Sequence, residues 1–373
     1  MKKLAGAIFF DVLILMILGL AMVMSASSTY SSFKFDSIFY LFNSHFIKVI
    51  MGIVFLLIFS FLPYDIYKNI SKKLIIAITI VLILTLFLAP NYKGAGRWIN
   101  LGFTTFQPAD AAKLILIIHL SALIESKKEY LSNFKYGFVY LYFWVLMIAG
   151  LILIQPNISN GVLIVVISLA LMYVGGARLK HIFSASFFSL LGGGIVAMLF
   201  SHSRERILSF INSIQNGGDI NIQVKQALLG LGSGGIFGVG MGHSRQSDLF
   251  LPEAYGDFIF AILGEETGFL GSVIVLILFL TIFAAGILIA KKTKDEFGQL
   301  LAFGISFSII IYAFVNVAVA TGLFPTTGLP LPFISYGGTS LIFLCISVGI
   351  LINIAISNSM EEKKLNLNRS AAK

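Results

Sequence analysis

Ten long apolar segments limit what this 373-residue chain can fold into. Each is roughly 20 residues long, the length that an α-helix needs to cross a bilayer. Only 12% of the residues are charged, whereas soluble domains have about 25%. The segments are 5–28, 44–62, 74–90, 109–124, 137–154, 161–177, 181–200, 258–290, 298–322 and 340–357. The sequence therefore predicts an all-α polytopic membrane protein with about ten transmembrane helices.

The basic residues predict the orientation of these helices. Most of the 26 lysine and arginine residues lie in alternate connections, starting with Lys2 and Lys3. Short loops rich in lysine and arginine face the cytoplasm, so we expect both termini there. The net charge of +9 is then mainly a topology signal, and it gives little support to nucleic-acid binding. The single cysteine, Cys345, excludes an intramolecular disulfide and a cysteine metal site.

The other, outer connections hold seven of the eight prolines. Proline fixes φ and removes a hydrogen-bond donor, which indicates rigid, shaped loops on this side. We therefore expect the working surface to face outward. Residues 1–358 are predicted to form one membrane domain with a large outer loop, 201–257, between the seventh and eighth helices. Residues 359–373 are polar and charged, and we expect a disordered cytoplasmic tail.

The first outer cluster is GAGRWINLGFTTFQPADAAK, residues 94–113. Pro108 is expected to start a helix whose first turns carry Asp110 and Lys113 on one face. A helix-start carboxylate with its ion-pair partner is the structural alternative. However, an unpaired lysine inside a span costs about 2.5–3.5 kcal/mol. The pattern thus favours binding of an anionic ligand, such as a phosphate, by Lys113.

Two further clusters carry neutral polar side chains. ILIQPNISNG, at 152–161, offers Asn157, Ser159 and Asn160, although capping of the sixth helix explains these residues equally well. TGLFPTTGLPLPFISYGGTS, at 321–340, offers Ser335, Tyr336 and Thr339. A structural turn between the ninth and tenth helices is the alternative for this cluster.

The large outer loop contains two recognisable patterns. SHSRERILSFINS is typical of an amphipathic helix on the membrane surface, with Arg204 and Arg206 near the headgroups. Gly230 to Gly235 matches the dinucleotide pattern G-x-G-x-x-G. No strand precedes this match, so a nucleotide site is disfavoured. We expect the glycines instead to let this loop pack tightly against the helices.

In Arg245 to Gly271, RQSDLFLPEAYGDFIFAILGEETGFLG, four carboxylates lie within fourteen positions near the start of a long apolar helix: Glu253, Asp257, Glu265 and Glu266. Polar residues at such a place are costly and are functional candidates. Asp257 is the candidate for the chemistry, with a simple helix cap as the alternative. Glu253 would share its face if the helix began early. Glu265 or Glu266 is expected to mark a kink or an inter-helix bond.

Six motifs together resemble the SEDS family (FtsW/RodA/SpoVE) over nearly the whole chain. They are GAGRWI, QPADAAK, QPNISNG, LGSGGIFGVGMGHSRQ, LPEAYGDFIFAILGEETG and TTGLPLPFISYGGTS. GMGHSRQ and SVGILINI are more similar to the division branch, FtsW, than to the elongation branch, RodA. The resemblance implies a peptidoglycan glycosyltransferase that polymerises lipid II outside the bacterial cytoplasmic membrane during septal synthesis. It also implies a class B penicillin-binding protein (a transpeptidase) and other division proteins as partners. No cofactor is implied, and assistance by a divalent cation at the diphosphate stays open.

The resemblance also assigns residues. Asp257 corresponds to the acidic residue of LPEAHTDF, Arg97 to the arginine of GAxRW, and Lys113 to the lysine of QPSELAK. The expected substrate-binding residues are Arg97, Gln107, Asp110, Lys113, Glu266 and Ser335. The departures from the family pattern are Asp110 for Glu, Asn157 for Asp, Ser159 for Gly, and Tyr255-Gly256 for His-Thr.

We expect Asp257 to act as the general base that takes the proton from the attacking sugar hydroxyl, giving displacement with inversion. A lipid flippase or transporter is the main alternative, and a non-catalytic division scaffold is another. Transporters place ionisable residues near the midplane on broken helices. Here the polar clusters lie at the outer helix ends, which favours the enzyme.

Overall fold

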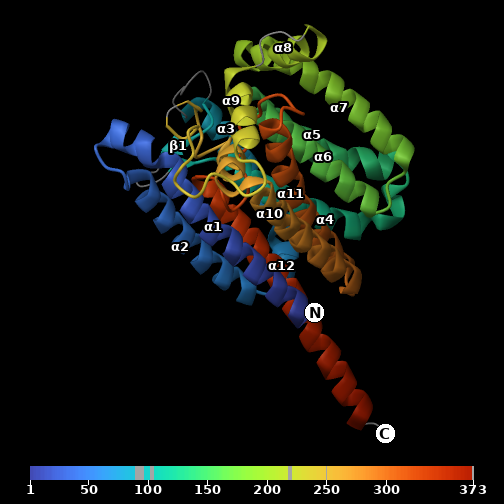
Figure 1. The fold of residues 1–373 in the computed structure, drawn as a ribbon. Coiled ribbons are helices and arrows are strands. Elements are labelled where there is room, and N and C mark those ends of the chain that lie inside the picture. The colour runs from blue at the N-terminus through green and yellow to red at the C-terminus, as the bar shows by residue number, and fades with distance from the viewer. Residues whose placement is uncertain (89–95, 101–104, 217–220, 249, 372–373) are drawn as a thin grey trace.

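A computed structural model describes residues 1–88, 96–100, 105–216, 221–248 and 250–371, and nearly all of this chain is helical (Figure 1). The helices are α1 (Lys2–Phe35), α2 (Tyr40–Phe61), α3 (Asp65–Leu88), α4 (Pro108–Leu131), η1 (Phe134–Phe138), α5 (Val139–Ile154), α6 (Ile158–Val174), α7 (Leu179–Leu199), α8 (Ser201–Asn216), α9 (Ile222–Ser233), α10 (Ile259–Lys292), α11 (Glu296–Ala320) and α12 (Thr339–Ala371). Two-residue strands β1 (Ile99–Asn100) and β2 (Thr105–Phe106) pair antiparallel, with Ile99 opposite Phe106.

Each predicted span coincides with a helix. Within the described residues, eight helices are long and apolar enough to cross a membrane: α1, α2, α3, η1 with α5, α7, α10, α11 and α12. The other two predicted spans correspond to α4, whose sequence carries several charges, and to α6, which has 17 residues. The prediction of an all-α polytopic membrane protein is confirmed.

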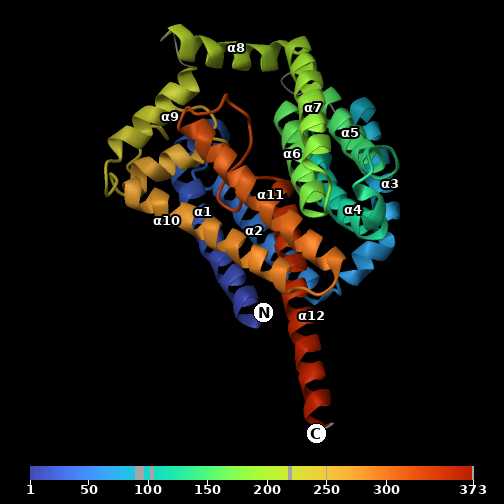
Figure 2. The same cartoon turned by 90° about the vertical axis from the view of Figure 1, so that its right-hand side faces the viewer.

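The helices form two groups on either side of α10 and α11. Figure 1 shows α1 and α2 on one side and α5, α6 and α7 on the other. α12 packs against α2, α1 packs against α10, and α10 packs against α11. The connections that contain residues 96–100 and 105–106, 234–248 and 250–258, and 321–338 gather at the end of the bundle that we call the loop end. Both termini lie toward the opposite, terminal end (Figures 1 and 2).

The predicted amphipathic helix is present as α8, which extends from α7 toward α9 across the loop end (Figure 2). The predicted tail disorder is wrong, because α12 continues as a helix through Ala371. Residues 359–371 are rich in leucine, lysine and glutamate, which favour helix, so the helix extends beyond the apolar segment.

α10 is broken at Gly268, whose φ of 70° and ψ of −167° are outside the helical region. The glycine-rich loop that follows α9 packs against this break and bonds to both halves of the helix. The four backbone bonds, 2.9–3.2 Å long, are Val239 N to Glu265 O, Gly240 N to Glu266 O, Phe269 N to Gly235 O and Leu270 N to Ile236 O. A Cβ at Gly238 would lie 2.1 Å from the Glu266 carbonyl oxygen, so only glycine permits this approach. Both the kink and the tightly packed loop are as predicted.

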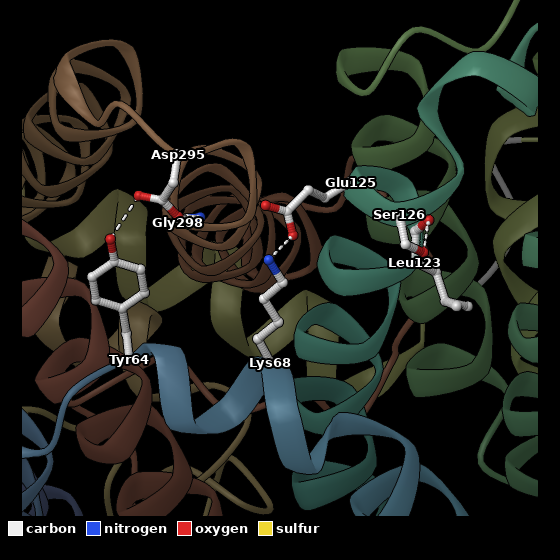
Figure 3. Close-up of polar contacts among 7 residues, drawn as sticks. All are labelled: Tyr64, Lys68, Leu123, Glu125, Ser126, Asp295 and Gly298. Carbon is white, nitrogen blue, oxygen red and sulfur yellow. Dashed lines mark hydrogen bonds and ion pairs between the residues drawn. The ribbon is translucent and has the colours of Figure 1, made fainter.

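Polar contacts also join the helices at the terminal end (Figure 3). The Tyr64 hydroxyl donates to Asp295 Oδ1 at 2.6 Å, while Asp295 Oδ2 accepts from Gly298 N at 2.7 Å and caps α11. Lys68 on α3 forms an ion pair of 2.6 Å with Glu125 on α4. Burial and the bond to Asp295 raise the pKa of Tyr64, which keeps it protonated as the donor. These contacts fix the terminal ends of α3, α4 and α11 relative to one another.

Candidate active site at the loop end

Asp257 lies just before α10, in a backbone segment held by two neighbouring elements. The side-chain amide of Asn316 on α11 donates to the carbonyls of Asp257 and Leu329, both at 2.7 Å. Ser335 Oγ donates to the Gly256 carbonyl at 2.7 Å. The residue at the N-cap of α10 is Phe258, not Asp257. The N-cap position, which the capping alternative assigned to Asp257, is thus occupied by the following residue.

Glu253 does not share a helix face with Asp257, as it would if α10 began early. The helix begins at Ile259, and Glu253 is exposed with a φ of 58° in the preceding turn. Asp257 is thus the carboxylate of this turn that faces the other polar loops.

Two arginines lie around the Asp257 carboxylate. A Cβ built on Gly328 would be 3.5 Å from Asp257 Oδ2 and 3.6 Å from Arg206 Nη1, so these two groups flank this glycine. Arg206 also donates to the Thr326 carbonyl at 3.3 Å. Arg97 donates to the Gln155 carbonyl at 3.2 Å and to the carbonyl of the next residue, at the α5–α6 turn.

The pKa values of the arginines reflect this proximity. Burial and the nearby Arg206 charge together lower the pKa of Arg97 to about 10, although Asp257 acts in the opposite sense. Burial also lowers the pKa of Arg206, again opposed by Asp257. Both guanidiniums remain cationic at neutral pH. The site therefore combines one carboxylate with two partly desolvated cations.

Arg206 is the site residue that the sequence analysis missed, since it was assigned to the membrane surface with Arg204. Arg204 is exposed, whereas Arg206 is half-buried. Two residues correspond to about 200° of helix rotation, so two such neighbours face different ways. The two-residue spacing of Arg204 and Arg206 on an amphipathic helix thus indicates that the two side chains have different surroundings.

A cavity of about 220 Å³ adjoins Arg206 between α8, α9 and the connection that follows α11. Its polar lining includes Ser209, Ser213 and Asn221, and its apolar lining includes Val224 and Phe324. A mixed lining of this kind suits a ligand that has both polar and apolar parts.

Lys113 and Asp110 lie on α4 and are buried, at 9% and 6% exposure. In the described part of the chain they form no ion pair, in contrast to the structural alternative considered for them. Instead, Lys113 Nζ lies 3.8 Å from the centre of the Tyr312 ring on α11, a cation–π contact. Tyr312 precedes Asn316 by one helical turn, so the Lys113 ammonium lies below the backbone of Asp257.

A chain of hydrogen bonds extends from Tyr312 to α6. The Tyr312 hydroxyl donates to Asn160 Oδ1 at 2.6 Å, and Asn160 Nδ2 donates to Asn157 Oδ1 at 3.1 Å. Asn157 occupies the N-cap of α6 but its side chain makes no cap bond, so capping does not explain it. Asn157 Nδ2 and Asp110 Oδ2 are buried and have no partner among the described residues. These atoms can still bond a ligand or water.

The remaining predicted site residues hold the loops together. Ser335 is buried, and besides its bond to Gly256 it accepts from Leu331 N at 2.7 Å. The backbone N–H of Gln107 donates to Thr339 Oγ1 at 3.1 Å, which links the start of α4 to α12. In the structure these two residues position the segments around Asp257.

Glu265 and Glu266 are each 2% exposed and accept hydrogen bonds from the glycine-rich loop and from α1. Glu266 Oε1 accepts from Ser25 Oγ and from Gly242 N. Glu265 accepts four bonds, from Ser233 Oγ, Ser244 Oγ, Arg245 N and Gln246 N. The sequence indicated that one of them marks a kink; both lie at it, and Glu265 organises the loop.

Comparison with known proteins identifies the family of this chain. The profile of FTSW_RODA_SPOVE, described as "Cell cycle protein", matches residues 6–360. The chain belongs to the FtsW/RodA/SpoVE family. Stage V sporulation protein E of Bacillus subtilis (strain 168) is 34% identical over 348 residues, covering 92% of this chain and 94% of that protein. The probable peptidoglycan glycosyltransferase FtsW of Geobacter sp. (strain M18) is 33% identical over 365 residues, covering 95% and 98%.

Solved structures share the fold of this family member. One, described as "Structural coordination of polymerization and crosslinking by a peptidoglycan synthase complex", matches with a TM-score of 0.76 at 23% identity, covering 94% of this chain and 97% of that chain. The rod shape determining protein RodA of Thermus thermophilus matches with a TM-score of 0.70 at 24% identity, covering 94% and 96%.

Proposed function

We propose that this protein is a peptidoglycan glycosyltransferase that polymerises lipid II in septal cell-wall synthesis. The observation that carries the proposal is the placement of Asp257 beside Arg206 at the loop end, with Arg97 close enough to interact electrostatically with both. The names of the similar FtsW proteins support the activity. The loop end faces outward and both termini are cytoplasmic in this proposal, as the distribution of basic residues indicates.

Asp257 acts as the general base. The hydroxyl oxygen of the acceptor sugar attacks the anomeric carbon of the donor, and the hydroxyl proton passes to the Asp257 carboxylate. The bond from the anomeric carbon to the diphosphate oxygen breaks, and the electron pair leaves with the undecaprenyl diphosphate. Attack opposite the leaving group converts the α linkage to β. A positioned base of this kind contributes roughly 10²–10⁴-fold to the rate.

The arginines stabilise the leaving group. Its negative charge rises as the glycosidic bond breaks, and guanidiniums bind phosphate oxygens through charge-assisted, often bidentate bonds. Arg97 and Arg206 are partly desolvated, which strengthens this interaction relative to water. Lys113 adds positive charge one helical turn deeper, where Tyr312 holds its ammonium in place.

The partner in this proposal is a class B penicillin-binding protein, with further division proteins. A structural neighbour described as coordinating polymerization and crosslinking supports such a pairing. The transpeptidase would crosslink the glycan strands that this protein makes.

Polymerisation of labelled lipid II by the purified protein with its cognate transpeptidase tests the activity. We expect glycan strands that lysozyme digests. A flippase would instead move lipid II between the leaflets of vesicles without making polymer, and a scaffold would do neither. Intact complexes that give no polymer under these conditions would contradict the proposal.

A further inference from the structure

Three tyrosines meet at the loop end on the α1–α2 side of Asp257. Tyr255, two residues before Asp257, has its ring centre 5.3 Å from that of Tyr30 on α1 and 5.7 Å from that of Tyr336. Tyr336 N donates to the Tyr255 carbonyl at 2.9 Å. This tyrosine cluster (Tyr30, Tyr255, Tyr336) connects the turn that carries Asp257 to the ends of α1 and α2.

A cation and two hydroxyls lie beside Tyr336. Lys48 Nζ on α2 is 4.4 Å from the centre of the Tyr336 ring and donates to its hydroxyl at 3.2 Å. Ser44 Oγ, one helical turn earlier on α2, is also 3.2 Å from that hydroxyl. Lys48 is half-buried and pairs with no carboxylate among the residues that the structure describes. An ammonium inside a membrane helix without a counter-charge is costly, and it marks a place for an anion.

His45 gives a second, independent indication. It is 0% exposed, and its ring centre lies 5.8 Å from that of Tyr336. Neither ring nitrogen has a hydrogen-bond partner within the described chain. Leaving a buried polar group unsatisfied costs about 1–3 kcal/mol. The unsatisfied ring nitrogens of His45 and the unpaired ammonium of Lys48 belong to residues three positions apart on α2. They therefore lie on one face of this helix.

The reaction requires two such anion sites. If the proposed function holds, both the donor and the acceptor carry a lipid-linked diphosphate, and each diphosphate needs its own cations. Arg206 is on α8, which Figure 1 shows on the far side of α9 from α1 and α2. Arg97 and Arg206 together can bind one diphosphate, so the second diphosphate needs a cation elsewhere.

We propose that Lys48, with the hydroxyls of Ser44 and Tyr336, binds the diphosphate of the second polyprenyl-linked substrate. The tyrosine cluster then lies between this diphosphate and Asp257, where the aromatic rings can pack against the sugar that follows the diphosphate. Lys48 lies eight residues into α2, about 12 Å along the helix from its start. A lysine at this depth can extend its ammonium along the apolar stem toward the headgroups. The polyprenyl chain would lie along the lipid-facing side of α2.

The structural alternative is that Lys48 only fastens α2 to the loop around Tyr336. Lys34 provides a matched control, because its Nζ also lies near a tyrosine ring, 5.3 Å from the centre of Tyr30, and donates to that hydroxyl at 2.8 Å. Lys34 is exposed, unlike Lys48. If Lys48 only fastens α2, then replacing Lys48 by methionine and replacing Lys34 by methionine should leave the binding of diphosphate similar.

Titration of the purified protein with undecaprenyl diphosphate tests the proposal. We expect two equivalents bound by the wild type, one by Lys48→Met, one by Arg206→Gln, and two by Lys48→Arg and Lys34→Met. A second equivalent bound by Lys48→Met with unchanged affinity would overturn the inference, as would a single equivalent bound by the wild type. No binding by the folded wild type would contradict the proposed function as well.

Competition with phosphatidylglycerol separates a diphosphate site from a general lipid-headgroup site. We expect the second equivalent to resist a tenfold excess of phosphatidylglycerol. Its full displacement would overturn the assignment to a diphosphate. Size-exclusion profiles and thermal unfolding of Lys48→Met that match those of the wild type confirm that its loss of binding is not due to misfolding.

Discussion

Glu265 offers a sharp test of how the loop that leads to Asp257 is held. Each of its carboxylate oxygens accepts one backbone N–H and one hydroxyl, from Arg245 and Ser233 at Oε1 and from Gln246 and Ser244 at Oε2. In Glu265→Gln the amide oxygen keeps one such pair. The new NH₂ group faces the other serine hydroxyl and the other backbone N–H. The hydroxyl can rotate to accept a hydrogen bond from the NH₂ group, whereas the backbone N–H can only donate and loses its acceptor.

The variant thus loses at least one hydrogen bond to a charged group, worth about 1.5–3 kcal/mol. If that loss appears as easier local opening, amide exchange at Arg245 and Gln246 accelerates by roughly 10- to 160-fold. Glu265→Ala removes all four bonds and should accelerate exchange further. Hydrogen–deuterium exchange with peptide resolution over 238–252 measures this directly.

Glu205→Gln is the control, because Glu205 is an exposed carboxylate on α8. Its exchange should match the wild type throughout 238–252. Exchange in Glu265→Ala within twofold of the wild type would refute the assignment of Glu265 as the organiser of this loop.

Three further predictions follow from the geometry. Arg206→Gln should lower the initial rate of lipid II polymerisation by at least about tenfold, because a lost charge-assisted bond is worth about 1.5–3 kcal/mol. Arg206→Lys should recover part of this rate. Equal rates for Arg206→Gln and the wild type would remove Arg206 from the site. Gly238→Ala should lower the midpoint of thermal unfolding, since its Cβ would lie 2.1 Å from the Glu266 carbonyl oxygen, and an unchanged midpoint would contradict this packing. Binding of diphosphate at the arginine site should weaken as the pH rises through about 10, because Arg97 loses its proton there. Affinity that stays constant from pH 8 to 11 would count against a role of Arg97 in binding.

The sequence was sufficient to predict the helices because apolar runs of membrane-spanning length leave few alternatives. Helices alone satisfy backbone hydrogen bonds in lipid without pairing to another segment. The end of α12 was mispredicted because charge and polarity at 359–373 suggested disorder, although the same residues favour helix. The break at Gly268 was anticipated only as a kink near Glu265 and Glu266, because loop-to-helix backbone bonds carry no local sequence pattern.

Three residues of the candidate site could be proposed from the sequence, but not their arrangement. Asp257, Arg97 and Lys113 were identified one by one, yet nothing local to them indicates that Lys113 lies on Tyr312, nearly 200 residues away. Arg206 was missed because an arginine on an amphipathic helix usually contacts headgroups. Its approach to Gly328 depends on how α8 crosses the loop end, which is a property of the whole fold.

The proposed role of Asp257 as the general base is tested most directly by its substitution. Polymerisation of labelled lipid II should be compared for the wild type, Asp257→Asn and Asp257→Glu, each purified with its transpeptidase partner and checked for undecaprenyl diphosphate binding. We expect a loss of about 10²–10⁴-fold in Asp257→Asn with retained binding, and partial activity in Asp257→Glu. Glycan strands formed by Asp257→Asn at the wild-type rate would contradict it.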